Sequence, residues 1–216
     1  MKIYSFDEKN SVFNQFIAEL RDVHIQKDAM RFRRNLERVG EVFAYEISKT
    51  LNYESTEVQT PLGIATCSLP ADQVVIASIL RAGIPLHNGL LNYFDKAHNA
   101  FIAAYRKYGK DNKFTIQLEY MAAPDLDNKV LILSDPMLAT GSSVLLTYQH
   151  LLQKGTPQHT HIVSAIASKE GVAFLMRQLP KKGVTLWFGA IDEELTVKSF
   201  IVPGLGDAGD LAYGTK

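Results

Sequence analysis

The sequence of 216 residues has few of the features that mark secreted or membrane proteins. Its one cysteine, Cys67, cannot form an internal disulfide, which favours a reducing compartment. The longest apolar runs, such as Val74–Leu80, are far shorter than the roughly 20 residues of a membrane span. Residues 1–10 carry several charges and no apolar signal core. We therefore expect a cytoplasmic protein with no membrane contact.

An excess of charge of either sign is also missing. Lys plus Arg and Asp plus Glu number 23 each, so the formal net charge is zero. This balance lacks the electrostatic signature of a nucleic-acid-binding protein, which makes a nucleic-acid partner unlikely. A basic cluster lies within residues 31–38, and we favour a solvated or salt-bridged helix face for it. The six histidines show no metal-ligand spacing with Cys67, so we expect no metal site built from side chains.

The order of apolar patterns predicts one α/β domain over residues 1–216. Residues 1–50 read as a helical segment, with Ser11 capping a first helix and apolar residues at helical spacing over 27–50. From residue 74, short continuous apolar runs alternate with helical stretches. The predicted strands are Val74–Leu80, Ala100–Tyr105, Val130–Ser134, His161–Ser168 and Val184–Phe188, and the predicted helices are 86–93, 142–153 and 170–178. Such alternation is typical of a parallel sheet covered by helices on both faces, which binds ligands beyond the carboxyl ends of its strands.

Residues 107–123 interrupt this alternation. Apolar and polar residues alternate from Phe114 to Tyr120, the period of a half-buried strand, after a polar turn at 109–112. We expect a hairpin or flap that projects from the core.

A candidate phosphate site follows the predicted strand Val130–Ser134. An acid, Asp135, ends the strand, and Thr140-Gly141-Ser142-Ser143 opens the next helix. Free backbone N–H groups at a helix start, beside glycine and small hydroxyls, suit a phosphate, and a carboxylate suits ribose hydroxyls. Simple helix capping by the hydroxyl side chains is the alternative.

A second candidate site is the glycine-rich run 200–210, Phe-Ile-Val-Pro-Gly-Leu-Gly-Asp-Ala-Gly-Asp. Its Gly-x-Gly-x-x-Gly spacing lacks the following helix and strand of a dinucleotide fold, because few residues remain. Glycines let backbone N–H and C=O groups approach a ligand and read the edge of a flat base. A glycine-rich tail without function is the alternative.

These segments together resemble one family. Asp135-Pro-Met-Leu-Ala-Thr-Gly141 is similar to the phosphoribosyl pyrophosphate (PRPP) signature of type I phosphoribosyltransferases, in the form found in uracil phosphoribosyltransferases. The run 201–210 resembles the uracil-binding loop of the same family, and Leu80-Arg-Ala-Gly83 and Tyr105-Arg106 match its arginine motifs. Ser142 stands where the family usually has glycine, and 107–123 matches the family's flap in position only.

The resemblance implies a pentosyltransferase that converts uracil and PRPP to UMP and pyrophosphate in pyrimidine salvage. It implies Asp135, Arg106 and Asp207 as catalytic residues and Ile201, Gly206, Asp207 and Ala208 as uracil-binding residues. The implied PRPP-binding residues are Arg81, Arg106, Asp135, Pro136, Met137, Leu138, Ala139, Thr140, Gly141, Ser142, Ser143 and Asp207. It further implies Mg²⁺ carried mainly by the substrate pyrophosphate, a homodimer or homotetramer, and GTP as an effector.

Three alternatives accompany this interpretation. A phosphoribosyltransferase for a purine base would share the phosphate loop, but the run 201–210 argues against it. A pyrimidine-responsive RNA-binding regulator would use the basic cluster at 31–38. A catalytically silent ligand sensor would not need the acids and arginines that the chain retains.

Overall fold

A mostly parallel sheet forms the centre of the protein. The structure is a computed structural model that describes residues 1–108 and 114–215, with side chains described outside 104–118. The sheet has eight strands in the order β1-β10-β9-β7-β4-β5-β6, with β8 added beside β9. Neighbouring strands are parallel, except that β6 runs antiparallel to β5. The strands are β1 (Lys2–Ser5), β4 (Val74–Leu80), β5 (His98–Tyr108), β6 (Phe114–Ala122), β7 (Val130–Ser134), β8 (Met137–Leu138), β9 (His159–Ser168) and β10 (Val184–Asp192).

The central strands are buried on both faces, as their continuous apolar runs predict. Every residue of β7 is buried, and so is every residue of β4 except the half-buried Leu80. Their register pairs Val74 with Val130 and Ser78 with Ser134. The five predicted strands are confirmed, and β5, β9 and β10 are longer than predicted.

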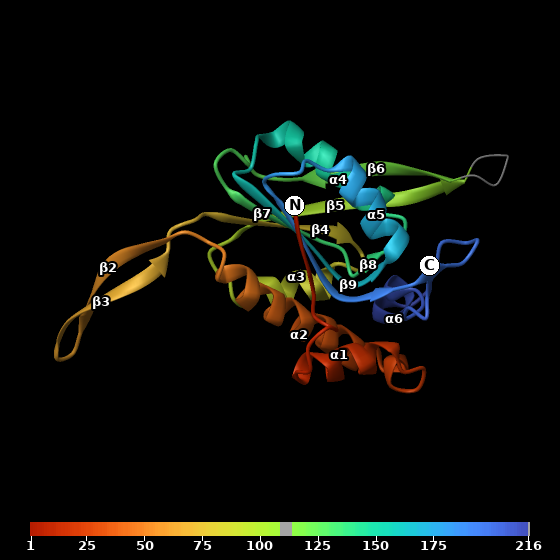
Figure 1. Ribbon diagram of the computed structural model, residues 1–216, viewed down its shortest axis with the longest axis horizontal. Coiled ribbons are helices and arrows are strands. Elements are labelled where there is room, and N and C mark those ends of the chain that lie inside the picture. Colours follow the sequence, from red (N-terminus) through yellow and green to blue (C-terminus); the bar gives the residue numbers. More distant parts are fainter. Residues whose placement is uncertain (109–113, 216) are drawn as a thin grey trace.

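Helices cover both faces of this sheet (Figure 1), which confirms the predicted α/β class. One face carries α1 (Val12–Arg21), α2 (Ala29–Ser48) and α3 (Ile84–Leu91), and the other carries α4 (Ser142–Leu151) and α5 (Lys169–Gln178). Ser11 caps α1 by accepting a hydrogen bond from Phe13 N, as predicted from the sequence. Short 3₁₀ turns, η1 (Ile25–Lys27) and η2 (Leu152–Lys154), follow α1 and α4.

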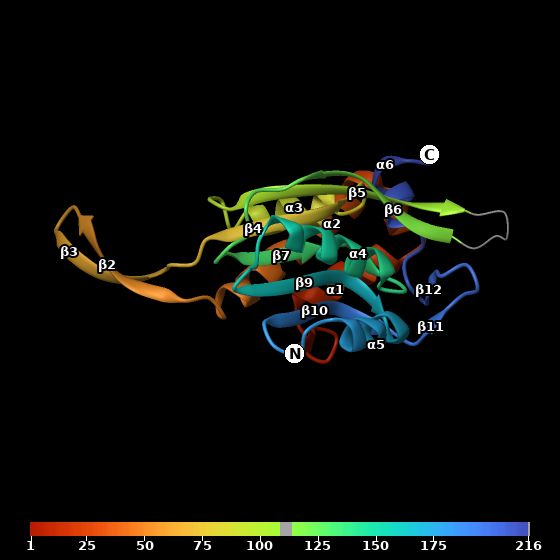
Figure 2. The same cartoon turned by 90° about the horizontal axis from the view of Figure 1, so that it is seen from above.

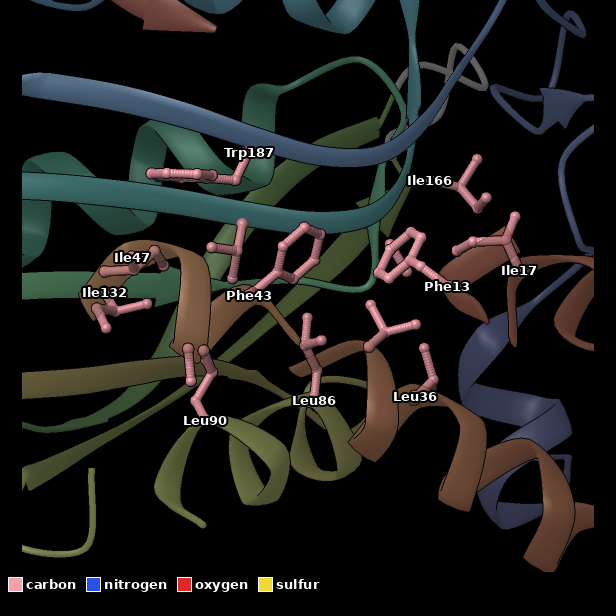
Figure 3. Close-up of a cluster of buried hydrophobic side chains, with 14 of the residues drawn as sticks. Phe13, Ile17, Leu36, Phe43, Ile47, Leu86, Leu90, Ile132, Ile166 and Trp187 are labelled. Atoms are coloured by element: carbon pink, nitrogen blue, oxygen red, sulfur yellow. The ribbon is translucent and has the colours of Figure 1, made fainter. Parts of the chain in front are cut away.

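An aromatic cluster fills the space between the sheet and α1, α2 and α3. Phe13 and Phe43 point from the helices towards the strands, and Trp187 and Ile132 of the sheet belong to the same cluster (Figure 3). The Phe13 and Phe43 ring centroids lie 5.8 Å apart, within the range of favourable aromatic pairs. This packing fixes the N-terminal helices against the strands whose ends form the site described below.

Helices α2 and α3 cross with almost no space between their backbones. A Cβ added to Gly89 would lie 1.9 Å from the carbonyl oxygen of Glu37, and one on Gly40 would lie 2.4 Å from that of Leu86. The absence of side chains at both glycines therefore sets the distance between these helices.

The expectation of a wholly helical segment over residues 1–50 is wrong at its start. Residues 2–5 form β1, an edge strand parallel to β10, with Ile3 opposite Leu186. The pairing is supported by Tyr4, whose ring stacks on Trp187 at a centroid distance of 4.3 Å. This contact joins residues distant in sequence, so the local pattern does not reveal it.

Two hairpins project from opposite ends of the molecule (Figure 2). The predicted excursion at 107–123 is confirmed as the β5–β6 hairpin, whose predicted turn at 109–112 lies outside the described residues. The second hairpin was not predicted: β2 (Tyr53–Thr60) and β3 (Gly63–Pro70) form a separate two-stranded sheet. The C-terminal run also contains regular structure, β11 (Glu194–Leu195), β12 (Ile201–Val202) and α6 (Ala208–Tyr213), where only a loop was expected.

Replacing Gly89 with alanine tests the close crossing of α2 and α3. Helix propensity alone predicts that the free energy of unfolding rises by up to about 1 kcal/mol. The clash with the Glu37 carbonyl predicts instead a loss of about 1–3 kcal/mol, because the helices must move apart. Urea denaturation measures the sign of the change in the free energy of unfolding. Asn88→Ala, at an exposed neighbouring position, is the control. A Gly89→Ala protein as stable as the wild type would contradict the tight crossing.

Candidate active site

The predicted site segments meet at the carboxyl edge of the parallel strands. Arg81 follows β4, and Asp135 follows the neighbouring strand β7. The backbone of Arg106 lies in β5, which continues beyond the end of β4, because Leu80 pairs with Ala103. The side chain of Arg106 lies outside the described part of the structure. This is the edge where an α/β sheet binds ligands.

The segment 135–139 is held along strand β9 by its backbone. Asp135 N donates to Val163 O at 3.1 Å, and Ile166 N donates to Pro136 O at 3.1 Å. Met137 and Leu138 form β8 beside β9, and one Asp135 carboxylate oxygen accepts a 3.3 Å hydrogen bond from Met137 N. The strand pairing therefore positions this acid at the sheet edge.

The end of this segment packs directly on the start of α5. The Ser168 hydroxyl donates to Ala139 O at 2.5 Å and accepts from Gly171 N at 2.9 Å. A Cβ at Gly171 would lie 2.2 Å from the Ala139 oxygen. Only glycine at this position lets the segment approach the helix so closely.

The start of α4 has the geometry expected of an anion site. Gly141 is the N-cap residue with φ of 80°, so it takes the left-handed conformation that favours glycine. Ser142 is the first helical residue, and its φ is not positive. The departure from the family pattern at Ser142 therefore costs no backbone strain. The Thr140 hydroxyl contacts both Ser142 N and Ser142 Oγ. The N–H groups in the first turn of α4 point out of the N-terminal end of the helix, as helix geometry requires.

A partly buried ion pair holds the C-terminal loop against β10 and α1. Arg21, the last residue of α1, binds the two carboxylate oxygens of Asp192 at 2.7 and 2.8 Å. Gly204 completes the group, because its N–H donates to Asp192 at 2.9 Å and its carbonyl accepts from Arg21 at 3.0 Å. We call these three residues the Arg21–Asp192–Gly204 bridge. Gly204 has φ of 57° and sits so close to Ile201 O that a Cβ would lie 2.2 Å away.

Two further arginines bind the last residues of the chain. Arg33 of α2 donates to Ala212 O at 2.7 Å, and Arg81 donates to Gly214 O at 3.1 Å. Arg81 also lies 3.8 Å from the carboxylate of Asp210. The turn after β4 and the C-terminal run therefore touch directly.

Two of the predicted base-binding residues are buried and two are exposed. Ile201 and Ala208 are buried in the core cluster that Met137 and Ala139 also contact. Gly206, with φ of 94°, and Asp207 are exposed. Asp207 Oδ1 caps α6 by accepting from the N–H groups of Gly209 and Asp210, while Oδ2 has no partner among the described residues.

Sequence reasoning missed Arg21, Arg33 and Asp192. The predicted strand ended at Phe188, whereas β10 continues to Asp192. Had the strand been extended to Ile191, Asp192 would have stood at a strand end as Asp135 does. Nothing in the local pattern of Arg21 or Arg33 signals a partner 171 or 179 residues away.

The arginines of the basic cluster at 31–38 mostly bind other side chains of the same protein. Arg31 pairs with Glu19 at 2.8 Å, and Arg34 pairs with Glu37 and Glu41. Arg38 donates to Asn35 Oδ1 and lies over the Phe16 ring. This pairing is the salt-bridged helix face that the sequence favoured.

The described residues contain no group of three or more His, Cys, Asp or Glu side chains placed to hold a metal ion. Within the same residues, no helix is both long and apolar enough to cross a membrane.

Comparison with known proteins decides the family. The family model described as "Uracil phosphoribosyltransferase" matches residues 8–215. The chain belongs to the uracil phosphoribosyltransferase family. A relative of this name from Porphyromonas gingivalis is 56% identical over the whole of both chains. One from Pyrococcus furiosus is 37% identical over 98% of this chain and 90% of its own.

Solved structures agree at the level of the fold. The AQ2163 protein from Aquifex aeolicus superposes with a TM-score of 0.87 at 28% identity, covering 99% of both chains. A hypoxanthine phosphoribosyltransferase from Staphylococcus aureus gives a TM-score of 0.50 at 12% identity over 76% of each chain, and shows a common fold. Both likenesses agree with the type I phosphoribosyltransferase fold expected from the sequence.

Asp192→Asn should loosen the C-terminal loop of this family member. It leaves the partly buried Arg21 without its charge partner, which costs about 1–3 kcal/mol. Amide hydrogen exchange over 200–213 should accelerate about tenfold or more. Glu193→Gln is the matched control, because the ion pair of Glu193 among the described residues is the exposed one with Lys169. Equal exchange in the two variants would show that the bridge does not hold the loop.

Proposed function

We propose that this protein transfers the phosphoribosyl group of PRPP to uracil, giving UMP and pyrophosphate in pyrimidine salvage. The observation that carries the proposal is the meeting, at one sheet edge, of the Asp135–Ser143 segment and the C-terminal loop. The first suits a ribose phosphate and the second suits a flat base. Membership of the family supports the same assignment.

The phosphoribosyl group is assigned to the segment 135–143. The N–H groups that open α4, with the Thr140, Ser142 and Ser143 hydroxyls, would bind the 5′-phosphate. Asp135 would accept hydrogen bonds from the ribose hydroxyls, and residues 136–139 would form the wall beneath the sugar. Strand pairing with β9 supports this role, because it fixes the acid and the helix start relative to each other.

The pyrophosphate is assigned to Arg81 and Arg106, at the ends of neighbouring strands. Guanidinium groups donate paired hydrogen bonds to phosphate oxygens and spread the leaving-group charge. In the described structure Arg81 contacts Gly214 O and faces Asp210, so the same side chain joins this subsite to the C-terminal run.

Uracil is assigned to the backbone around Ile201, Gly206, Asp207 and Ala208. The two buried residues fix the loop, and Gly206 leaves space beside the backbone, because a Cβ added there would have no neighbouring atom closer than 3.8 Å. Fixed backbone donors and acceptors would read the uracil edge, and a base with the reversed pattern would leave groups unpaired at about 1–3 kcal/mol each. Asp207 Oδ2 would face the phosphoribosyl side.

The proposed chemistry is positional and electrostatic. The bond from ribose C1 to pyrophosphate breaks, positive charge grows on the sugar ring, and uracil N1 forms the new bond to C1 and loses its proton to solvent. The arginines stabilise the leaving group, and the two loops hold N1 against C1. The scheme has no covalent enzyme intermediate, because attack by uracil itself displaces pyrophosphate.

The remaining proposals concern the metal, the assembly and the setting. Carboxylate oxygens such as those of Asp135 and Asp207 suit Mg²⁺, with most of its coordination supplied by pyrophosphate oxygens and water. The hairpin β2–β3 supports a homodimer or homotetramer, because an isolated two-stranded sheet is marginally stable and this one exposes Leu62 and Ile64. GTP as an effector and a cytoplasmic location rest on the family resemblance and on the composition.

The activity itself gives the first test. Purified protein with labelled uracil, PRPP and Mg²⁺ should form UMP, and Asp135→Asn should lower kcat/KM by about 10²-fold or more. Asp125→Asn, whose exposed carboxylate pairs with Lys129, is the control and should behave as wild type. Hypoxanthine, guanine and cytosine in place of uracil test the purine rival and the base assignment. No UMP from folded protein, or equal use of a purine base, would overturn the proposal.

Gly206→Ala tests whether the C-terminal loop binds uracil and not PRPP. A side chain at φ of 94° costs about 1 kcal/mol and shifts the loop backbone. We expect the KM for uracil to rise about tenfold while the KM for PRPP changes less than about twofold. Gly183→Ala carries a similar conformational cost at φ of 74°, with open space around it, and should change neither KM. Equal effects of Gly206→Ala on both KM values would remove the loop from base recognition.

A further inference from the structure

A cavity of about 560 Å³ lies at the edge of the sheet opposite the candidate active site. Its walls come from the starts of β1, β7, β9 and β10 and from the base of the β2–β3 hairpin, whereas the site above uses the strand ends. The lining includes Lys2, Tyr4, Asp72, His159, His161 and Lys182. None of the residues assigned to the transfer reaction lies here.

The charges around this cavity are unbalanced. The lining residues include Lys2, Lys181, Lys182 and the N-terminal Met1, but a single carboxylate, Asp72. That carboxylate already accepts hydrogen bonds from Asn52 N, Asn52 Nδ2 and Gln158 Nε2 at 2.7, 3.1 and 2.7 Å. Among the described residues, Lys2 and Lys182 form no ion pair with an acid. Unpaired cations around a concave surface attract anions.

A buried histidine adds a neutral donor to this lining. His161 is 2% exposed, and its Nδ1 lies 3.0 Å from Trp187 Nε1. Because an indole N–H can only donate, Nδ1 is the acceptor and the ring hydrogen is on Nε2. No described residue accepts a hydrogen bond from this Nε2–H. Burial, with a smaller effect of His159, lowers the pKa of His161 to about 3, so the ring stays neutral at pH 7.

We propose that this cavity binds a multiply charged phosphate anion, held by Lys2 and Lys182 and by a hydrogen bond from His161 Nε2. Charge-assisted bonds from ammonium groups favour phosphate oxygens, and the neutral imidazole N–H adds direction. The volume exceeds that of a phosphate group, and Tyr4, 38% exposed, offers a ring beside it. The ligand class therefore includes both inorganic pyrophosphate and organic diphosphates.

The single tryptophan of the chain reports on this cavity. Trp187 stacks on Tyr4 and donates to His161, and both partners line the cavity. Titration of untagged protein with inorganic pyrophosphate at constant ionic strength should give a saturable change in indole fluorescence. The Lys2→Ala, Lys182→Ala double variant should weaken the apparent affinity at least about tenfold, since each lost ammonium removes a charge-assisted bond.

Matched variants distinguish this site from others. Lys96→Ala removes an exposed lysine from the same side of the sheet but outside the cavity, and should leave the titration unchanged. Arg81→Ala changes the proposed pyrophosphate subsite of the active site, and the fluorescence response should persist in it. ADP in place of pyrophosphate identifies the source of the anion, with tighter binding of ADP indicating an organic phosphate.

Three results would overturn the proposal. They are the absence of a saturable response, a response that sodium chloride reproduces at equal ionic strength, and a response unchanged in the double lysine variant. A cavity filled by a second copy of the chain would give the first of these. Circular dichroism and uracil transfer from PRPP, with no further phosphate anion added, should match wild type in the double variant, since neither lysine belongs to the transfer site. Anion binding and transferase activity are therefore tested by independent measurements.

Discussion

The bidentate contact between Arg21 and Asp192 connects three otherwise separate parts of the molecule. It joins the end of α1, the end of β10 and the backbone of Gly204, at 2.7–3.0 Å throughout. The aromatic packing of Phe13 and Phe43 sets the position of α1, and the sheet sets the position of Asp192. The location of the C-terminal loop therefore follows from the core through one ion pair, supported by the arginine contacts further along the chain.

The two halves of the candidate site depend on different kinds of interaction. The segment 135–143 is placed by strand pairing and by the close approach of Ala139 to Gly171. The C-terminal loop is placed by side-chain charges and by the burial of Ile201 and Ala208. A change in ionic strength acts on the second half more than on the first, because hydrogen bonds between strands carry no net charge.

Much of the fold was predictable because the central strands are continuous apolar runs. Such runs, as in Val74–Leu80, indicate burial on both faces wherever the chain places them. The acid after β7 and the glycine before α4 were predictable for a local reason, since both belong to one strand-loop-helix unit. By contrast, β1, Arg21 and Asp192 act through partners far along the chain, and the β2–β3 hairpin is exposed and shows little apolar alternation. Sequence patterns record burial and local turns better than such distant pairs.

The contact between Ala139 and Gly171 has a consequence for the thermodynamics of binding. The segment cannot move towards α5, where a Cβ would already overlap the carbonyl, and Ser168 holds it from the side. The proposed anion site at the start of α4 is thus preorganised before any ligand arrives. A ligand that enters it loses its own freedom but orders little of the protein, so less of the interaction energy is offset by conformational entropy.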